Sequence, residues 1–235
     1  MSSLKKLIKK TFIYKIYHKY QTERQEKQTV IRRLYFKEEG GLLLKKFSEA
    51  LNSKDIMFWL EFGTLLGYHR EYDFIDHDCD LDFGVNLCDA NKVRKVLEEF
   101  GFKRIHYFES SDGGLEECYK YAHTTLDVFY FRKEDNKLYC TSYTTFTHNP
   151  MDLISSIKPC LVKKIYIPNN GFKRVKYKDC NVYVPNKIEE HLIMHYGKSF
   201  MIPNPNFDFK KEATNISYYK YSDLSGRYIK IASLY

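Results

Sequence analysis

Four aspartates alternate along one short stretch of the chain. Asp76, Asp78, Asp80 and Asp82 stand at every second position of residues 74–85. Successive side chains of a β-strand point to opposite faces, so a strand would place these carboxylates on one face, about 6–7 Å apart along it. So much negative charge on one face is unfavourable unless protons or a cation offset it. Because hard oxygen ligands suit Mg²⁺ or Mn²⁺, the segment predicts a divalent metal site.

An EF-hand calcium loop is the main alternative for this segment, and its spacing argues against it. The sixth position of such a loop must be glycine, because the chain turns sharply there. Counted from Asp78 that position is Phe83, and counted from Asp76 it is Leu81. The apolar residues that alternate with the aspartates also favour a strand.

The chain before the aspartates has the order strand, turn, helix. Met57–Phe62 is short, aromatic and apolar, as a buried strand is, and Gly63-Thr64 ends it before a helical turn over Leu65–Arg70. A turn that opens a helix presents backbone N–H groups and the positive end of the helix dipole, which favour phosphate. Metal ions on the following strand, Asp78–Val85, would bridge phosphate oxygens and offset charge on a leaving group.

Two further acids are candidates for the same site. Asp127 is the lone acid in an apolar strand, where an unpaired carboxylate costs free energy, so we expect it to supply a third carboxylate. The alternative for Asp127 is a residue at a strand end that bonds to a turn. Glu61 precedes the Gly63-Thr64 turn and is a candidate for binding substrate, and equally a candidate for capping the amide groups of residues 63–65.

Alternating patterns along the chain predict a mixed α/β sheet domain with an N-terminal helical extension. A charged helix over residues 1–38 is followed by Gly40-Gly41, which we expect to interrupt it, and by a second helix over Leu42–Leu51. A third helix, Ala90–Phe100, is expected to start with Asp89 as its cap. The strands expected after it are Phe102–Phe108, Leu115–Ala122, Leu126–Arg132, Leu138–Tyr143, Leu161–Ile167 and Val182–Val184.

The last helix that the sequence predicts covers Lys187–His195. Asn186 and Glu189 have the spacing of a capping box at its start, and Gly197 is expected to end it. Residues after 203 are rich in Tyr, Asn and Pro, and their pattern assigns them no role.

Histidines, cysteines and basic residues offer further ligands. His191 and His195 have a spacing that can bind zinc, but because no acid completes the pattern, the interpretation as a partly buried structural pair is favoured. The six cysteines contain no Cys-x-x-Cys pair and are expected to be small buried apolar residues, with a zinc site that includes Cys118 and His123 as the alternative. Basic side chains that would contact an anionic donor or acceptor, unless they are simply solvated, are Lys120, Arg132, Lys163 and Lys164.

The positive charge of the chain is concentrated at its N-terminus. Thirty-eight basic and thirty acidic residues give a net charge of +8, and residues 1–20 hold lysines and no acid. The remainder is only mildly basic, which argues against a nucleic-acid partner.

Two interpretations fit residues 1–20. A helical projection has lysines on one arc and an apolar stripe on the other, as an interfacial helix on anionic lipid has; a solvated basic arm is the alternative. The stripe consists of Leu4, Leu7, Ile8, Thr11 and Tyr14. No apolar run approaches the roughly 20 residues of a membrane span. We therefore expect a cytoplasmic protein, either free or peripheral on the cytoplasmic face of a membrane.

Three segments together resemble the LicD and fukutin-related protein family. Phe58–Arg70, which reads F-W-L-E-F-G-T-L-L-G-Y-H-R, and the acidic segment F-I-D-H-D-C-D-L-D-F-G are similar to its two central motifs. Val184–Gly197 is similar to its C-terminal motif, and the likeness covers residues 42–205. Two departures bear on donor choice without removing a metal ligand: Asp76-His77 stands where the family has Pro-Trp, and Tyr68-His69 stands where it has small residues.

The resemblance implies a nucleotidyltransferase-like fold and a transferase activity. The family moves a phosphorylated alcohol, such as phosphocholine or a polyol phosphate, from a CDP-linked donor to a sugar hydroxyl of a surface glycan or glycolipid. The likeness also implies Mg²⁺ or Mn²⁺ as cofactor and catalytic roles for Asp80, Asp82 and Asp127. Carried over by position, the metal ligands are Asp78, Asp80, Asp82 and Asp127, and the substrate contacts are Gly63, Thr64 and Arg70, beside Glu61.

Two other functions stay open as hypotheses. One is a nucleotidyltransferase that moves a nucleoside monophosphate to a hydroxyl or a phosphate, and the other is a non-catalytic membrane adaptor with a structural metal site. The expected organisation is a basic helical extension over residues 1–40, a catalytic domain over 41–205, and a Tyr-rich segment of unknown role over 206–235.

Overall fold

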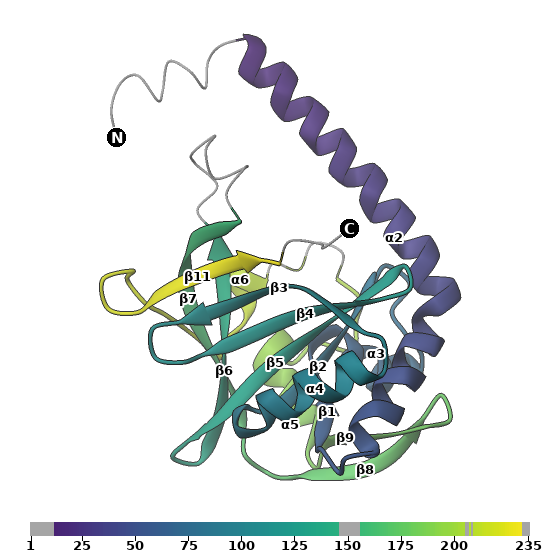
Figure 1. Cartoon of the computed structure of the whole chain (residues 1–235). Helices are drawn as coiled ribbons and strands as arrows, with labels where there is room; N and C mark the ends of the chain where they lie inside the picture. Colours follow the sequence, from purple (N-terminus) through teal and green to yellow (C-terminus); the bar gives the residue numbers. More distant parts are fainter. Residues whose placement is uncertain (1–11, 146–155, 205–206, 208, 232–235) are drawn as a thin grey trace.

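The acidic segment lies in the middle of a mixed sheet (Figure 1). The computed structural model describes residues 12–145, 156–204, 207 and 209–231, and eleven strands of this part pair in one sheet. Strand β2 (Asp80–Asn86) pairs in parallel with β5 (Thr124–Glu134) and antiparallel with β1 (Phe58–Leu60). The predicted mixed α/β fold is therefore confirmed.

The strand order is β10-β7-β11-β3-β4-β5-β2-β1-β9-β8, and β6 pairs with β5 and β7. The remaining strands are β3 (Lys103–Ser110), β4 (Leu115–Tyr121), β6 (Lys137–Thr145), β7 (Ile157–Pro168), β8 (Phe172–Tyr177), β9 (Cys180–Pro185), β10 (Ile216–Tyr218) and β11 (Ser225–Lys230). The helices are α2 (Phe12–Asn52), α3 (Phe62–Glu71), α4 (Ala90–Glu99), α5 (Ile188–Tyr196) and α6 (Phe209–Glu212), with the 3-10 helix η1 (Leu87–Asp89).

The strand pairings close a ring at one side of this sheet. Strand β6 pairs with β5 and β7, β7 pairs with β11, and β11 pairs with β3, so the ring runs β3-β4-β5-β6-β7-β11. Strand β11 is thus needed to complete the ring, although the sequence pattern assigned no role to residues after 203. Strand β8 was also missed, because it is a charged edge strand without apolar alternation.

Helix α2 is continuous, so the prediction that Gly40-Gly41 divides it is wrong. A Cβ added to Gly40 would stand 3.1 Å from the Phe36 ring and 3.3 Å from the Phe74 ring, which shows that the helix packs closely there. The half of α2 after this point buries Leu43, Leu44, Phe47 and Leu51. That packing outweighs a helix penalty of about 1 kcal/mol for each glycine.

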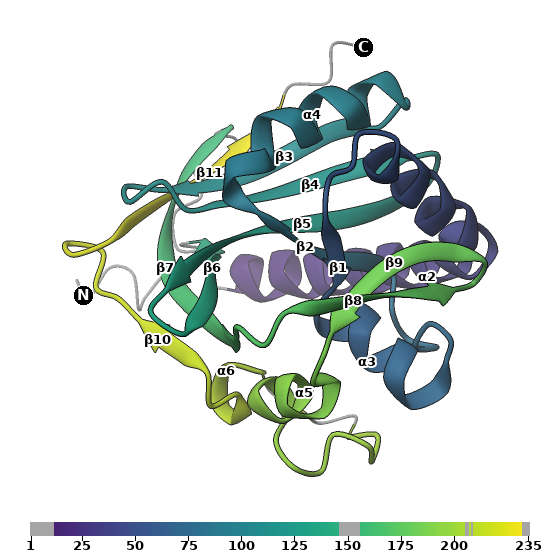
Figure 2. The ribbon, with the colours of Figure 1, turned by 90° about the horizontal axis from the view of Figure 1, so that it is seen from below.

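Aromatic packing fixes α2 against the sheet face that turns away from the aspartates. Phe47 stacks on Phe83 of β2 with ring centroids 4.1 Å apart, and it meets Phe58 of β1 edge-on at 5.2 Å. Phe83 and Asp82 are neighbours in a strand, so their side chains point to opposite faces. Figure 2 shows α4 on one side of the strands and α3, α5 and α6 on the other. Helices thus cover both sides of the strands. Phe83 belongs to the core on one face, and Asp82 lies on the opposite face.

The two predicted helix caps have different outcomes. Asp89 occupies the N-cap position of α4, as predicted, but its carboxylate pairs with Lys92 at 3.1 Å and makes no cap hydrogen bond. Asn186 donates its amide to the carbonyl oxygen of Asn170 at 2.9 Å and does not cap α5. Both side chains found partners that a local sequence pattern does not include. The predicted end of α5 at Gly197, whose φ is +78°, is confirmed.

None of the helices in the described part of the chain combines the length and the apolar character needed to cross a membrane. The apolar stripe expected over residues 4–14 falls on side chains outside the described part, so it stays a prediction.

The contact between β1 and β2 generates a stability prediction. A Cβ added to Gly84 would stand 2.2 Å from the fully buried Trp59 ring. Gly84→Ala is therefore expected to lower the free energy of unfolding by about 1–3 kcal/mol, as overpacked cores do. Urea unfolding followed by tryptophan fluorescence measures the change.

Gly41→Ala is the matched control, because nothing lies within 4 Å of a Cβ added there. This variant should raise the free energy of unfolding by about 0.5–1 kcal/mol, since alanine favours a helix interior. Equal stability of Gly84→Ala and the wild type would contradict the packing of Trp59 on β2.

Candidate active site

Carboxylates from two parallel strands share one face of the sheet. In the register of β2 and β5, Asp82 stands opposite Asp127 and Asp80 stands opposite Thr125. Residues directly opposite each other in paired strands present their side chains on the same face, within contact distance. The structure thus brings Asp127 to Asp80 and Asp82, which precede it by more than forty residues in the chain. We call this group the carboxylate row.

The other two aspartates of the alternating segment do not lie on the strand. Asp76 is exposed in a turn, and Asp78 closes that turn by donating its N–H to the Ile75 carbonyl at 3.0 Å. The expectation of four acids on one strand face is therefore wrong, because the chain turns before β2 begins. The Asp78 carboxylate nevertheless reaches the site, since its Oδ2 would stand 3.1 Å from a Cβ added to Gly63.

The same face continues across β4 and β3. Cys118 stands opposite Asp127 and donates a side-chain hydrogen bond to it, and His106 stands opposite Cys118. Ligand atoms of these three residues all lie within 4.8 Å of one another. The alternative zinc site with Cys118 and His123 does not form, because the His123 Nδ1 lies 2.8 Å from the Glu39 carboxylate on α2. His106 was missed, since only the strand register connects it to the aspartates.

Helix α2 contributes an arginine that the sequence patterns did not indicate. The Arg32 Nη2 donates to Asp80 Oδ2 at 2.7 Å and to Thr125 Oγ1 at 3.2 Å. Asp80 and Asp127 both raise the pKa of Arg32 against the effect of its partial burial, which lowers it. A cation therefore already stands at the edge of the carboxylate row.

Burial and mutual repulsion shift the acids of this site in one direction. Burial, followed by the charge of Asp80, raises the pKa of Asp127 to about 7. The same two causes raise the pKa of Asp78 to about 7. Burial, then Asp80 and Asp127, holds the pKa of Asp82 well above its usual range. Each of these carboxylates is thus destabilised in its charged form and would be stabilised by a nearby cation.

Glu116 extends this acidic environment along β4. It stands opposite Phe129, two pairs along the register from Cys118 and Asp127, so its side chain lies on the same face as Asp127. Burial, then Asp127, raises the pKa of Glu116 well above its usual range, and its Oε2 has no hydrogen-bond partner among the described residues. The sequence did not indicate Glu116 as a site residue, because it lies in a strand that carries both acidic and basic side chains.

A divalent ion fits the chemistry of the carboxylate row, because its donors are carboxylate oxygens that repel one another. The described residues contain two groups whose three ligand atoms lie within 4.8 Å, namely Glu61–His191–His195 and His106–Cys118–Asp127, and the carboxylate row is not one of them. Binding one ion through Asp80, Asp82 and Asp127 together would therefore require these side chains to turn toward one another.

The turn that opens α3 is fixed to the acidic strand by two hydrogen bonds. The Asp82 N–H donates to the Thr64 hydroxyl at 2.8 Å, and the Glu61 N–H donates to the Asp82 carbonyl at 3.1 Å. Thr64 is buried, so its side chain positions Asp82, whereas the sequence predicted a contact with substrate. Phe62 begins the helix with φ of +42°, a costly conformation for a non-glycine residue that the surrounding packing must stabilise.

Glu61 lies beneath this turn in a buried polar cluster. Its Oε1 lies 2.6 Å from the His191 Nε2 and 2.9 Å from the His195 Nε2, and its Oε2 accepts from the Trp59 Nε1 at 2.7 Å. Burial raises the pKa of Glu61, but the two histidines outweigh that effect, so its pKa lies below its usual range. Glu61 is fully buried and makes no cap hydrogen bond. Neither of its two expected roles, substrate contact or helix cap, agrees with this placement.

The tautomer of His195 favours a hydrogen-bonded cluster over a zinc site. The Asn215 amide donates to the Tyr166 carbonyl at 2.8 Å, which fixes the orientation of the amide, and its nitrogen lies 3.0 Å from the His195 Nδ1. Burial lowers the pKa of His195, so the ring is neutral, and with Nδ1 as acceptor its proton lies on Nε2. That nitrogen donates to Glu61 and is not open to a metal. The interpretation of the histidines as a buried structural pair is supported.

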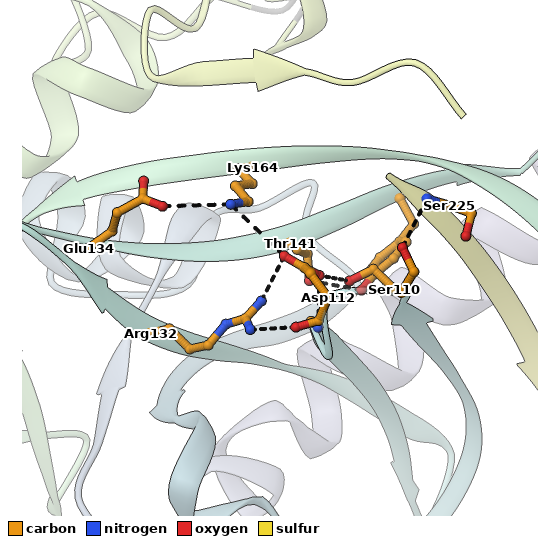
Figure 3. Close-up of polar contacts among 10 residues, drawn as sticks. Ser110, Asp112, Arg132, Glu134, Thr141, Lys164 and Ser225 are labelled. Atoms are coloured by element: carbon orange, nitrogen blue, oxygen red, sulfur yellow. Dashed lines mark hydrogen bonds and ion pairs between the residues drawn. The ribbon is translucent and has the colours of Figure 1, made fainter. Parts of the chain in front are cut away.

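Three of the five basic candidates pair with acids that do not belong to the carboxylate row. Arg70 donates twice to the neighbouring Glu71, at 2.9 and 2.6 Å, in place of the expected donor phosphate. Figure 3 shows Arg132 and Lys164 around Asp112 at the turn between β3 and β4. Arg132 donates to the Asp112 carboxylate at 3.0 Å, and Lys164 lies 3.9 Å from it.

The last two basic candidates occupy different positions. Lys163 is buried above the Phe209 ring, 5.4 Å from its centroid. Lys120 is exposed and stands opposite Thr125, on the face of the carboxylate row. Of these five, Lys120 has the position that best suits contact with an anionic ligand of the site.

The fold and the site define a nucleotidyltransferase-like domain: a mixed sheet, carboxylates on adjacent parallel strands, and a helix-opening turn fixed against them. A family model described as "LicD/FKTN/FKRP, nucleotidyltransferase domain" matches residues 55–187. The chain therefore belongs to the LicD/FKTN/FKRP family, and the resemblance read from the motifs is confirmed.

Curated relatives are similar to most of the chain. It is 25% identical over 183 residues to the human "Ribitol-5-phosphate transferase FKTN" and 24% identical over 183 residues to that of Macaca fascicularis. Each match covers 77% of this chain and 37% of the relative, so the chain spans well under half the length of these proteins. It is also 35% identical over 100 residues to "Uncharacterized protein RP689" of Rickettsia prowazekii (strain Madrid E), which covers 43% of this chain and 36% of that protein.

The raised pKa values of Asp78 and Asp127 predict how stability depends on pH without a divalent ion. An aspartate in an unfolded chain has a pKa of about 3.8, whereas the pKa of these two is about 7 in the folded protein, so the folded protein keeps protons that the unfolded chain releases. The free energy of unfolding should therefore fall as pH rises from about 4 to 7. Asp127→Asn should raise it at pH 8 in EDTA by about 2 kcal/mol and flatten this dependence.

Asp76→Asn is the control, because Asp76 is exposed in the turn before β2 and should leave the profile unchanged. Chemical unfolding in EDTA at several pH values measures both variants. A wild-type protein that gains stability between pH 5 and 8 would contradict the repulsion within the carboxylate row.

Removal of the Glu61 carboxylate tests the buried cluster. Glu61→Ala leaves the donors of Trp59, His191 and His195 unpaired in the core, so it should lower the free energy of unfolding by about 3–5 kcal/mol. Glu190→Ala on α5 is the control, because Glu190 pairs with Lys187 at the surface and its loss should cost less than about 1 kcal/mol. A small effect of Glu61→Ala in thermal unfolding would mean that the cluster does not hold α5.

Proposed function

We propose that this chain is a metal-dependent transferase that moves a phosphorylated alcohol from a CDP-linked donor to a sugar hydroxyl of a glycan or glycolipid. Mg²⁺ or Mn²⁺ is the proposed cofactor, and the cytoplasmic face of a membrane is the proposed location. The observation that carries the proposal is the register of β2 and β5, which sets Asp82 opposite Asp127 beside the turn that opens α3.

Asp80, Asp82 and Asp127 are the residues that would hold the ion, with Asp78 close by. When bound, the ion would offset charge on the diphosphate and on the leaving group. Burial and mutual repulsion disfavour the charged forms of these acids, so a bound cation would stabilise them. Thr64 supports this role by holding the backbone of Asp82 in place.

The start of α3 supports a phosphate contact. Its first turn leaves backbone N–H groups without acceptors in the helix, at the end where the helix dipole attracts anions. The Asp78 carboxylate lies against Gly63 at this point, so it competes with a phosphate while charged. Its pKa of about 7 makes the neutral form accessible, which removes that repulsion.

The names of the relatives suggest which phosphorylated alcohol to test first as the transferred group. Because the human and macaque proteins are named ribitol-5-phosphate transferases, a polyol phosphate is the first donor group to test. The chain covers only part of those proteins, so acceptor recognition by this chain is tested separately from donor cleavage.

Donor cleavage separates transfer of a phosphorylated alcohol from nucleotidyl transfer. CDP-ribitol labelled in both halves is incubated with Mg²⁺ and either water or glycan acceptors. Release of CMP together with the alcohol phosphate on the glycan acceptor supports the proposal. Water gives CMP and the free alcohol phosphate whichever phosphorus it attacks, so that arm measures donor cleavage alone. Release of the alcohol phosphate with CMP on the acceptor would instead establish nucleotidyl transfer.

Asp82→Asn tests whether the carboxylate row is catalytic. This variant keeps the shape of the side chain and should lower the rate of CMP release at least about a thousandfold, as loss of a major electrostatic contribution does. Asp76→Asn should keep the wild-type rate. Donor binding by the wild type without turnover under any condition would favour the non-catalytic adaptor.

A further inference from the structure

Arg32 connects the long helix α2 to the first residue of the acidic strand. Its Nη2 lies 2.7 Å from the Asp80 Oδ2 and 3.2 Å from the Thr125 hydroxyl. The Arg32 side chain is 46% exposed and that of Asp80 is 31% exposed, so the pair is reachable from solvent. Toward its N-terminus, α2 projects beyond the body of the protein (Figure 1).

This ion pair is not needed to hold α2 in place. The helix is fixed by buried aromatic and aliphatic side chains, among them Phe36, Leu43 and Phe47. An ion pair as exposed as Arg32–Asp80 adds little stability. The adjacent Arg33 makes a separate tether by donating its Nε to the His77 carbonyl at 3.0 Å. Anchoring of α2 therefore does not explain why Arg32 pairs with Asp80.

The partner of Arg32 distinguishes it from the two arginines that the sequence offered as contacts of an anionic substrate. Arg70 is bonded to Glu71, and Arg132 is bonded to Asp112. Arg32 instead holds Asp80, which is a proposed metal ligand. A divalent ion at Asp80 and the Arg32 guanidinium would repel each other unless an anion stands between them. A guanidinium presents several N–H donors in a plane and binds two phosphate oxygens at once.

We propose that Arg32 competes with a divalent ion for Asp80 and that, once the ion is bound, its guanidinium contacts the diphosphate of the donor. This proposal rests on the proposed function, because it assumes a nucleoside diphosphate conjugate as substrate. Arg32 is then a donor-binding residue supplied by α2, outside the residues 55–187 that the family model matches.

The first experiment measures ion affinity without nucleotide. Mn²⁺ is titrated by calorimetry into the full chain after removal of metals with EDTA. Arg32→Gln removes the competing cation and should tighten Mn²⁺ binding by about tenfold, given the strength of charge interactions at a few ångströms near a protein surface. Arg33→Gln is the matched control on the same helix and should change the affinity less than twofold.

The second experiment measures binding of CDP at saturating Mn²⁺. Arg32→Gln should weaken CDP about tenfold or more, the effect of losing a charged hydrogen bond. Arg32→Lys should recover part of the loss, because lysine keeps the charge but not the two-oxygen contact. Circular dichroism and melting temperatures verify that all three variants fold as the wild type does.

The outcomes separate this proposal from the proposed function. A wild type that binds Mn²⁺ but no CDP overturns the proposed function. A wild type that binds CDP, together with an Arg32→Gln variant that binds it equally well, overturns the role of Arg32 alone. Unchanged or weaker Mn²⁺ binding by Arg32→Gln overturns the competition for Asp80. Tighter Mn²⁺ and weaker CDP, with Arg33→Gln unchanged, establish the role of Arg32.

Discussion

The repulsion between carboxylates on β2 and β5 is the constraint on which the site depends. Parallel pairing places Asp82 directly opposite Asp127. Asp80 lies two residues before Asp82 in β2, on the same face of the sheet. Burial on this face strengthens the repulsion, and the pKa of Asp127 rises to about 7. A sheet would not keep such a group for stability, since an amide or an apolar residue would fit at lower cost. The arrangement becomes favourable when a cation joins it, and this is the physical basis of the proposed metal site.

Residues at the start of α3 hold the carboxylate row in place through the backbone of Asp82. Thr64 accepts a hydrogen bond from the backbone of Asp82, and Glu61 donates its N–H to the carbonyl of the same residue. Glu61 in turn is anchored by His191 and His195 of α5. A helix near the C-terminal end of the fold thereby sets the position of the turn that opens α3. The motif around that turn is thus as much a structural support as a candidate ligand-binding element.

Helix α2 has two functions along its length. Its C-terminal half packs Phe47 on Phe83 and builds the core behind the acidic strand. Further toward its N-terminus, Arg32 reaches the front of that strand at Asp80. One continuous helix therefore connects the core and the site, and a break at Gly40-Gly41 would have separated them.

The sequence by itself determined the features that depend on near neighbours in the chain. The alternation of Asp80 and Asp82 with apolar residues predicted a strand, the glycine after α5 predicted the end of that helix, and the lone acid in β5 predicted a carboxylate beside the acidic strand. The family motifs then indicated the fold, because they occupy the central strands and the turn between them. These signals are local, and local geometry follows from side-chain spacing.

Only the tertiary structure decided which distant residues meet. Glu61 and His191 are 130 positions apart and form the buried cluster, Arg32 and Asp80 are 48 apart, and His106 joins the site through strand register alone. Caps and glycine breaks were decided in the same way, because a packing partner from elsewhere in the chain outweighs a local preference of about 1 kcal/mol. Burial and electrostatic shifts also arise from the assembled fold, since they depend on what surrounds a group in space.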